Sequence, residues 1–123
     1  MIPRTLSEDE KRVLRHLIVS ELDEPEVLLR QIPFAHVTRH WIEGLPSIDI
    51  EVEPGVERAT TTTRTLSTEG NVSNENGDPI GLIVVWLEQG ALAGLEYAWF
   101  TDEPPTEWPS DDQISVKMAK YES

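Results

Sequence analysis

The segment from Ile80 to Leu87 places the strongest constraint on the fold, because it is the most hydrophobic stretch of the chain and has β-branched residues at its centre. A short, continuous apolar run is typical of a strand that is buried on both faces. Residues 88–90 (EQG) follow as a hairpin turn, with a glycine available for a positive φ angle. Residues 91–100 are predicted to return as the partner strand. We therefore expect an antiparallel hairpin in the interior of a sheet.

Two start signals near the N-terminus predict a pair of helices. Residues 7–10 (SEDE) match a capping box, and apolar residues follow at helical spacing, which predicts a helix over 8–21. Asp23 heads a second pattern of this kind, with a proline in the first turn, and predicts a helix over 24–31. With only a very short turn between them, residues 1–33 should form a helical hairpin.

After residue 33 the spacing of apolar residues changes to every second position, which predicts strands. The expected strands are 35–42, 47–53, 57–66, 80–87, 91–100 and 113–118, with 57–66 near an edge. Residues 67–79, rich in glycine and asparagine, are predicted to be a loop. The chain 1–123 is thus expected to be one α+β domain: the hairpin packs on a mostly antiparallel sheet of four to six strands (34–118), and 119–123 form a frayed tail.

The charge of the chain is strongly negative and unevenly placed. The formal net charge is −13, and no lysine or arginine occurs between Arg64 and Lys117. Such a field repels nucleic acid and anionic membrane and attracts a basic protein or a metal ion. We expect a basic protein partner, with neither a nucleic acid nor a membrane as partner. The alternative is that the acidic surface serves solubility alone.

Several classes of chemistry find no support in the sequence. Cysteine is absent, which excludes disulfides, thiolate metal sites and cysteine nucleophiles. There is no G-x-S-x-G motif and no glycine-rich phosphate loop. The longest strictly apolar run, from Leu82 to Leu87, is far shorter than the roughly 20 residues of a membrane span. Residues 1–12 show no apolar signal region, so a cytoplasmic location is the expectation.

His36 and His40, followed by Glu43, are the residues most reminiscent of a metal site. On a strand, residues four apart share a face but lie about 13 Å from each other, too far to hold one ion. We therefore expect no metal site and no cofactor.

Two groups of acidic residues are predicted to bind the partner. Asp49, Glu51 and Glu53 alternate with apolar residues, so they should line one face of a strand. The second group lies in a proline-rich segment and comprises Asp102, Glu103 and Glu107, with Trp108 as the anchor of that segment. These seven residues are the candidate partner-binding surface. The alternative for the strand residues is an ordinary solvated sheet face.

Glu96 and the tryptophans complete the set of notable residues. Glu96 lies between Leu95 and Tyr97 in an apolar strand, where it is either a contact or catalytic carboxylate or a residue on the solvent side. Two of the tryptophans, Trp86 and Trp99, are expected to fill the core. The other two, Trp41 and Trp108, are expected at an interface or as lids on the edge of the core.

Three segments carry a resemblance: RTLSEDEKRVLRHLI, PSIDIEVE and ALAGLEYAWFTDEPPTEWP. In this order they make the chain resemble a group of small, acidic, uncharacterised bacterial proteins, a likeness that implies no established activity. In size, acidity and α+β architecture the chain is also loosely similar to the immunity proteins of bacterial toxin systems, which bind and neutralise a basic toxin domain.

We therefore expect a non-enzymatic acidic binding protein, an immunity protein for a basic toxin domain. One alternative is a small enzyme or small-ligand-binding protein that uses Glu96 and a histidine. A further alternative is a nucleic-acid mimic. A pocket with perturbed titratable groups would favour the enzyme, and a shallow acidic surface would favour the binding protein.

Overall fold

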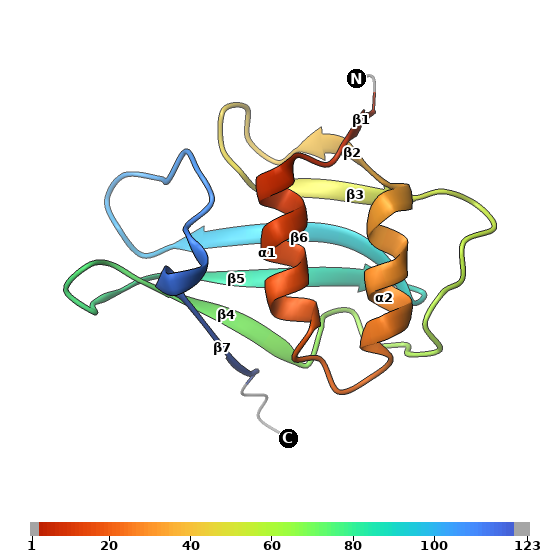
Figure 1. Ribbon diagram of the computed structural model, residues 1–123. Helices are drawn as coiled ribbons and strands as arrows, with labels where there is room; N and C mark the ends of the chain where they lie inside the picture. The colour runs from red at the N-terminus through yellow and green to blue at the C-terminus, as the bar shows by residue number, and fades with distance from the viewer. Residues whose placement is uncertain (1–2, 120–123) are drawn as a thin grey trace.

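The computed structural model describes residues 3–119 and shows an α+β fold of two helices and a seven-stranded antiparallel sheet (Figure 1). The helices are α1 (Glu8–Ile18) and α2 (Pro25–Gln31); short 3₁₀ turns η1 (Ile32–Phe34) and η2 (Asp111–Gln113) precede two of the strands. The strands are β1 (Arg4–Thr5), β2 (Ala35–His40), β3 (Ile48–Val52), β4 (Thr68–Ser73), β5 (Pro79–Glu88), β6 (Ala91–Trp99) and β7 (Ile114–Met118). Their order across the sheet is β1-β2-β3-β6-β5-β4-β7.

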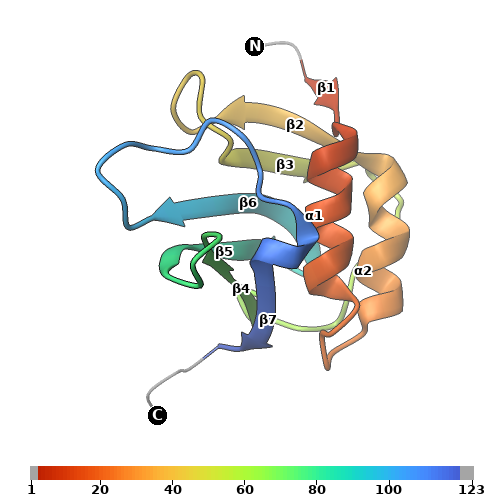
Figure 2. The same ribbon diagram turned by 60° about the vertical axis from the view of Figure 1, so that its left-hand side comes forward.

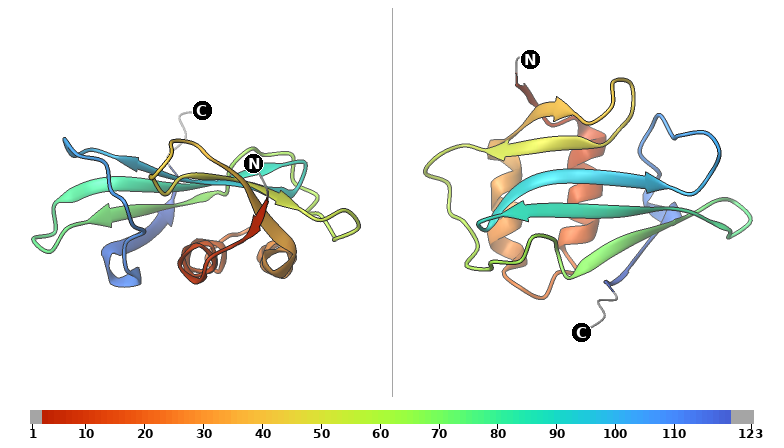
Figure 3. Two further views of the ribbon diagram at one scale, coloured as in Figure 1. Left: turned by 90° about the horizontal axis from the view of Figure 1, so that it is seen from above. Right: turned by 180° about the vertical axis from the view of Figure 1, so that it is seen from behind.

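Both helices lie on the same face of the sheet, as the views in Figures 2 and 3 show. The core lies between the helices and the sheet; its fully buried members include Leu14 and Leu17 of α1 and Ile83 and Val85 of β5. No helix of the described residues covers the opposite face, which we call the open face. None of these helices is long and apolar enough to span a membrane.

The helix α1 begins as predicted. Ser7 Oγ accepts a hydrogen bond from the Glu10 N–H (3.1 Å), and Glu10 Oε1 accepts one from the Ser7 N–H (2.7 Å). The helix ends at Ile18 instead of residue 21. Glu21 is not part of the helix, because its side chain binds backbone groups on both sides of the connection to the sheet. Its buried carboxylate accepts hydrogen bonds from the backbone of Leu22 (2.8 Å) and Ser67 (2.7 Å) and thereby ties the chain between the helices to the sheet.

The start of α2 differs from the prediction in its cap. Glu24, not Asp23, occupies the N-cap position, with a positive φ of 52° and no side-chain cap bond. Its carboxylate accepts two hydrogen bonds from Thr60 instead, both of 2.8 Å. Residues 19–24 therefore form a longer connection than the very short turn expected from the sequence.

The predicted strands match the structure except between residues 57 and 79. Residues 57–66, predicted as a strand, are irregular and pair with β5 only through the bridge from Thr65 to Trp86 and the backbone hydrogen bonds beside it. Residues 67–79, predicted as a loop, contain β4, which pairs with both β5 and β7. With β1 also present, the sheet has seven strands in the described residues where four to six were expected.

Gly70 shows why residues 67–79, although rich in glycine and asparagine, contain a strand instead of a continuous loop. A Cβ atom at this position would lie 2.9 Å from Ile114 Cγ2 and 3.4 Å from Leu17 Cδ1. The glycine is thus a strand residue on which helix and neighbouring strand pack closely, rather than a turn residue. The actual turn follows at residues 74–78, where Asn74 Oδ1 accepts hydrogen bonds from two backbone N–H groups and Gly77 has a φ of 83°.

The middle of the sheet is joined by a very short ladder. Strands β3 and β6 pair only at Ile48–Leu95 and Asp49–Gly94 and then separate. The fully buried Gln31, at the end of α2, serves the separated part: its Oε1 accepts from the Leu92 N–H (2.9 Å), and its Nε2 donates to the carbonyls of Gly90 and Glu57 (3.0 Å each). One side chain therefore satisfies the Leu92 N–H, which β3 leaves unpaired, and ties α2 to the carbonyls of Glu57 and Gly90, the latter of which also accepts a hydrogen bond from the Ala59 N–H (2.9 Å).

We predict that Gln31→Leu lowers the free energy of unfolding by about 3 kcal/mol, because each unsatisfied buried backbone group costs about 1–3 kcal/mol. Urea denaturation at neutral pH measures this change. The control is Thr62→Leu, at an exposed position of the irregular 57–66 segment without a positive φ angle, which should change stability by less than about 0.5 kcal/mol. Equal effects of the two variants would contradict the role given to Gln31.

A bidentate ion pair joins β1 to α1. Arg4 donates two hydrogen bonds of 2.9 Å to the nearly buried carboxylate of Glu10. Burial by itself would raise the pKa of Glu10, but the hydrogen bonds from Arg4 and from the Ser7 backbone outweigh it, so the pKa lies below its ordinary value of 4.5. The pair thus stabilises the fold fully above that pH, and its contribution disappears as the pH falls through the lowered pKa.

We predict that Glu10→Gln costs about 2 kcal/mol at pH 7, where charged hydrogen bonds are lost. The same variant should lose less stability than the wild type when the pH is lowered below 4.5. Urea denaturation at about pH 7 and about pH 3, on either side of the ordinary glutamate pKa, tests this. Glu26→Gln, on the exposed side of α2 and without an ion pair, serves as the control and should follow the wild type. A Glu10→Gln variant with the pH dependence of the wild type would refute the assignment.

Candidate functional site

The open face of the sheet carries apolar side chains of β5 that the sequence had placed in the core. Along β5, Ile83 and Val85 are buried, whereas Leu82, Val84 and Trp86 are only half-buried on the other side. The prediction that the run is buried on both faces was therefore wrong. Its physical cause is the one-sided covering of the sheet: β5 lies in the interior of the sheet, yet only one of its faces meets the helices.

Two tryptophans on the open face donate hydrogen bonds to carboxylates. Trp86 Nε1 donates to Glu96 Oε1 (3.0 Å), and Trp41 Nε1 donates to Asp49 Oδ1 (2.8 Å). Arg39 Nε donates to the other oxygen of Asp49 (2.9 Å). The polar end of each indole is thereby satisfied, which leaves its apolar ring for contact.

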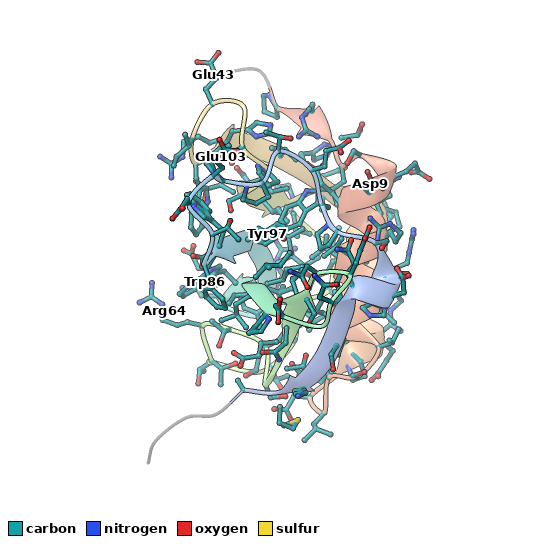
Figure 4. All side chains as sticks on the ribbon, turned by 90° about the vertical axis from the view of Figure 1, so that its left-hand side faces the viewer. Asp9, Glu43, Arg64, Trp86, Tyr97 and Glu103 are labelled. Atoms are coloured by element: carbon teal, nitrogen blue, oxygen red, sulfur yellow. The ribbon has the colours of Figure 1, made fainter. Side chains whose placement is uncertain are left out.

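Gly94 lies between these two pairs. It is opposite Asp49 in β3 and opposite Trp86 in β5, and a Cβ at this position would be 3.7 Å from Trp86 Cδ1. The Trp86 side chain therefore packs against bare backbone. The expected position of Trp86 in the core is corrected to a half-buried position on the open face, as Figure 4 shows on the side opposite the helices.

A pocket of about 250 Å³ lies where the 41–47 loop faces the last residues of β6. The loop contributes Trp41, Ile42, Leu45 and Ser47, and the strand contributes Glu96, Tyr97, Ala98 and Trp99. Its walls are mostly apolar, and Glu96 is the only carboxylate among the lining residues. Ser47 fixes the loop against β6, because its Oγ accepts a hydrogen bond from the Tyr97 N–H (2.9 Å).

The rim of this pocket is unusually apolar for an exposed surface. Trp41 is 37% exposed, Ile42 54%, Trp99 36% and the neighbouring Phe100 63%. Trp99 was expected in the core, but it is the last residue of β6, beyond the part of the strand that packs beneath the helices. Exposed aromatic side chains gathered at one end of a molecule are typical of an interaction site.

The acidic strand residues of the predicted surface have different roles in the structure. Asp49 is neutralised by Arg39 and engaged by Trp41, as described above. Glu53 lies just past the end of β3, and its Oε2 is 2.9 Å from His36 Nε2. Glu51 is exposed and has no hydrogen bond or ion pair of its side chain in the described structure. Of the three, only Glu51 therefore offers a free carboxylate.

The acidic residues of the second predicted group are all exposed. Asp102, Glu103 and Glu107 lie in the segment between β6 and η2, and their side chains form no ion pair among the described residues. The anchor of this segment is Trp108, as expected: its ring stacks on Tyr97, with centroids 5.8 Å apart. Burial raises the pKa of Tyr97 above its usual value of 10.0, in keeping with a phenol in the core.

Arg12 holds the far end of the same segment. It donates hydrogen bonds to Asp111 Oδ1 (2.6 Å) and to the Pro109 carbonyl (3.0 Å) and so ties the segment to α1. Burial alone would lower the pKa of Arg12, but the hydrogen bonds and charges of Asp111 and Asp9 raise it. The acidic segment is thus fastened at its C-terminal side, and its unpaired carboxylates face outward.

The structure does not bring the two predicted groups into one patch. Strand β3 runs antiparallel to β6, so the chain moves from Asp49 to Glu53 away from the segment that follows Trp99. At roughly 3.3 Å per residue, Glu53 and the start of that segment are about 30 Å apart. The pocket and the acidic loops lie at one end of the sheet, and Glu53 lies at the other. Glu43 and Glu103 are both at the pocket end (Figure 4).

The histidines lie apart from one another. A bulge between Val37 and Arg39 shifts the register of β2, so His36 is opposite Glu51 and His40 is opposite the buried Ile48. The statement that His36 and His40 share a face is therefore wrong, because the extra residue turns one of them over. No cluster of three potential metal ligands occurs among residues 3–119.

Sequence reasoning missed Ile42, Leu45 and Ala98 as members of the site and misplaced Trp86. Of the two positions considered for Glu96, the structure shows a half-buried one on the side opposite the buried Leu95 and Tyr97. The same alternation across the turn assigns Val84 and Trp86 to the side of Glu96, and this was the signal that could have found the site. The continuous apolar composition of β5 indicates instead a strand buried on both faces, and this indication is wrong.

No family model matches the sequence, and no curated protein or solved structure matches it significantly. The resemblance to small acidic bacterial proteins and to immunity proteins therefore stays a prediction.

We predict that the two indole–carboxylate pairs respond separately to mutation. Asp49→Asn should move the indole N–H signal of Trp41, and Glu96→Gln that of Trp86, because each indole donates to that carboxylate alone. Two-dimensional ¹⁵N–¹H spectra, assigned with single Trp→Phe variants, measure this. The control Glu26→Gln removes the same charge from the helical side and should move neither signal. Joint movement of both signals in one variant would contradict two separate pairs.

Proposed function

We propose that this chain is a non-enzymatic binding protein that uses its open face and acidic loops to hold a basic protein. The observation that carries the proposal is the pocket end of the sheet, where exposed aromatic residues adjoin carboxylates without cations. Trp41 and Trp99 supply apolar contact area, and Glu43 and Glu103 supply unpaired negative charge at the same end. Aromatic anchors surrounded by charge complementary to the partner are the usual composition of a protein interface.

The distribution of ion pairs supports a basic partner. Most arginines of the N-terminal half are already engaged, with Arg4, Arg12 and Arg39 bound to Glu10, Asp111 and Asp49. In contrast, the stretch from 65 to 116 contains no lysine or arginine. Its exposed carboxylates repel one another at short range, and a basic surface from outside would relieve this repulsion.

We propose further that the partner is a toxin domain that the chain neutralises, as an immunity protein does. Small size, strong acidity and an α+β architecture support this role. Neutralisation requires only a stable complex that covers the toxin, and a sheet face without helical cover is a surface of suitable shape. The role is tested by expressing the captured partner alone and together with this chain: growth inhibition that the chain abolishes is the expected result.

The alternative of an enzyme that uses Glu96 with a histidine has less support. The hydrogen bond of Glu96 comes from Trp86, and no histidine lines the pocket. Nor does a specific observation favour a nucleic-acid mimic: the strand acids do not form a uniform row of free charge, because Arg39 neutralises Asp49 and His36 lies against Glu53.

We predict that reversal of a free acid slows association with the basic partner. After affinity capture and identification of the partner, Glu51→Lys and Glu103→Lys should each lower the association rate several-fold at low salt and make it less salt-dependent. Both sites are exposed and unpaired, so the fold should be little affected. Asp49 is unsuitable for this test, because its reversal would also break the contact with Trp41.

Glu26→Lys serves as the matched control, because it makes the same charge change on the helical side of the molecule. Stopped-flow measurements at two salt concentrations compare the variants. Equal rates for Glu26→Lys and Glu103→Lys would mean that the pocket end is not the binding surface. A captured partner with an acidic surface would overturn the electrostatic basis of the proposal.

A further inference from the structure

We infer that the pocket between the 41–47 loop and β6 receives an arginine side chain of the basic partner; this inference rests on the proposed function. The first argument is the chemistry of its walls. Ile42 and Leu45 offer apolar surface for the aliphatic stem, and Trp41, whose indole binds Asp49 on the same side of the sheet as Glu96, offers an aromatic ring. Glu96 supplies a carboxylate at the same site. A guanidinium group prefers this combination of an aromatic face and a carboxylate.

The second argument is that Glu96 has capacity left for a donor. Its Oε1 accepts a hydrogen bond from Trp86, a neutral group, and no hydrogen bond to its Oε2 is present in the described structure. A carboxylate accepts about four hydrogen bonds when fully engaged. A guanidinium has five N–H donors in a planar arrangement, so it can bind the free oxygen while lying against an indole.

The third argument is that residues 3–119 provide no cation for this carboxylate. Arg39 is bound to Asp49, and Arg64, next to the strand partner of Trp86, lines a different hollow and points away from the molecule in Figure 4. Glu43 and Glu103 increase the negative potential at this end. The positive charge therefore has to come from a partner.

The size of the pocket selects a single side chain. Its volume of about 250 Å³ is below the roughly 300–1,000 Å³ of pockets for small-molecule ligands. A larger hollow of about 670 Å³, where β3 and β6 separate, has no aromatic wall, and its arginine, Arg58, is bound to the backbone carbonyls of residues 52, 53 and 56. Aromatic walls and a free carboxylate thus coincide at the smaller pocket.

The inference is tested with Nα-acetyl-arginine amide as the probe and Nα-acetyl-citrulline amide as its neutral analogue of nearly the same shape. The arginine probe should move the indole signals of Trp41 and Trp99 saturably, with a dissociation constant on the order of millimolar, as expected for so small a ligand. The citrulline probe should have no saturable effect. Glu96→Gln, which keeps an acceptor for Trp86, should weaken binding of the arginine probe by about tenfold or more. Glu26→Gln should leave it unchanged.

Each contrary result has a defined meaning. Equal effects of arginine and citrulline would show an apolar pocket that does not recognise charge, and would overturn the inference. Shifts confined to residues outside the pocket, or full binding by Glu96→Gln, would also overturn it. If the arginine probe fails but Glu103→Lys still slows association with the basic partner, the proposed function stands and only the pocket assignment falls. If neither test shows an effect, both fall.

Discussion

The short ladder between β3 and β6 is the constraint on which the two halves of the sheet depend. Only Ile48–Leu95 and Asp49–Gly94 pair across it, although both strands extend further. An antiparallel sheet normally continues such pairing, and each unpaired buried backbone group is costly. Two side chains supply the missing acceptors. Gln31 Oε1 accepts a hydrogen bond from the Leu92 N–H on one side of the ladder, and Ser47 Oγ accepts one from the Tyr97 N–H on the other. Both residues replace backbone partners that a longer ladder would have supplied.

The hollows on the open face follow from the same constraint. Before β3 begins at Ile48, the 41–47 loop does not pair with β6 and leaves the pocket beside Glu96. Where the strands separate at the other end, the larger hollow around Arg58 appears. The one-sided helical cover then determines what lines the first of these sites. Side chains that would be core in a two-sided arrangement, such as Trp86, remain half-buried and bind carboxylates through their polar ends.

Much of this fold could be predicted from local sequence signals. The Ser7 capping box, the alternation of residues 48–52 and the turn at Gly90 each act within a few residues, and the structure confirms them. Predictions failed where a distant contact outweighs local composition. Gly70 is a strand residue because Leu17 and Ile114 pack on it, and Glu24 is a cap because Thr60 binds its carboxylate. None of these three partner residues is near in sequence to the residue that it contacts.

The candidate site was predictable only in part for the same reason. Its acids and tryptophans stand out in the sequence, but their pairing depends on the register of β2, β3, β6 and β5, which no local pattern specifies. Register places Asp49 beside Trp41 and Glu96 beside Trp86, and it sends Glu53 to the far end of the sheet. The predicted acidic surface is therefore divided into acids that maintain the structure and acids that remain free.

This division assigns different physical roles to the free charges and to the pocket. Exposed carboxylates such as Glu103 act over about a Debye length, roughly 8–10 Å in physiological salt, and in the proposed complex they would influence how fast the basic protein associates. Glu96 is half-buried among tryptophans, where water screens less and a guanidinium would exchange hydration for aromatic and carboxylate contacts. In the proposed complex this contact would act mainly on the dissociation rate. A complex built in this way would lose its fast association in high salt while the contact inside the pocket persisted, because only the outer charges are fully exposed to counterions.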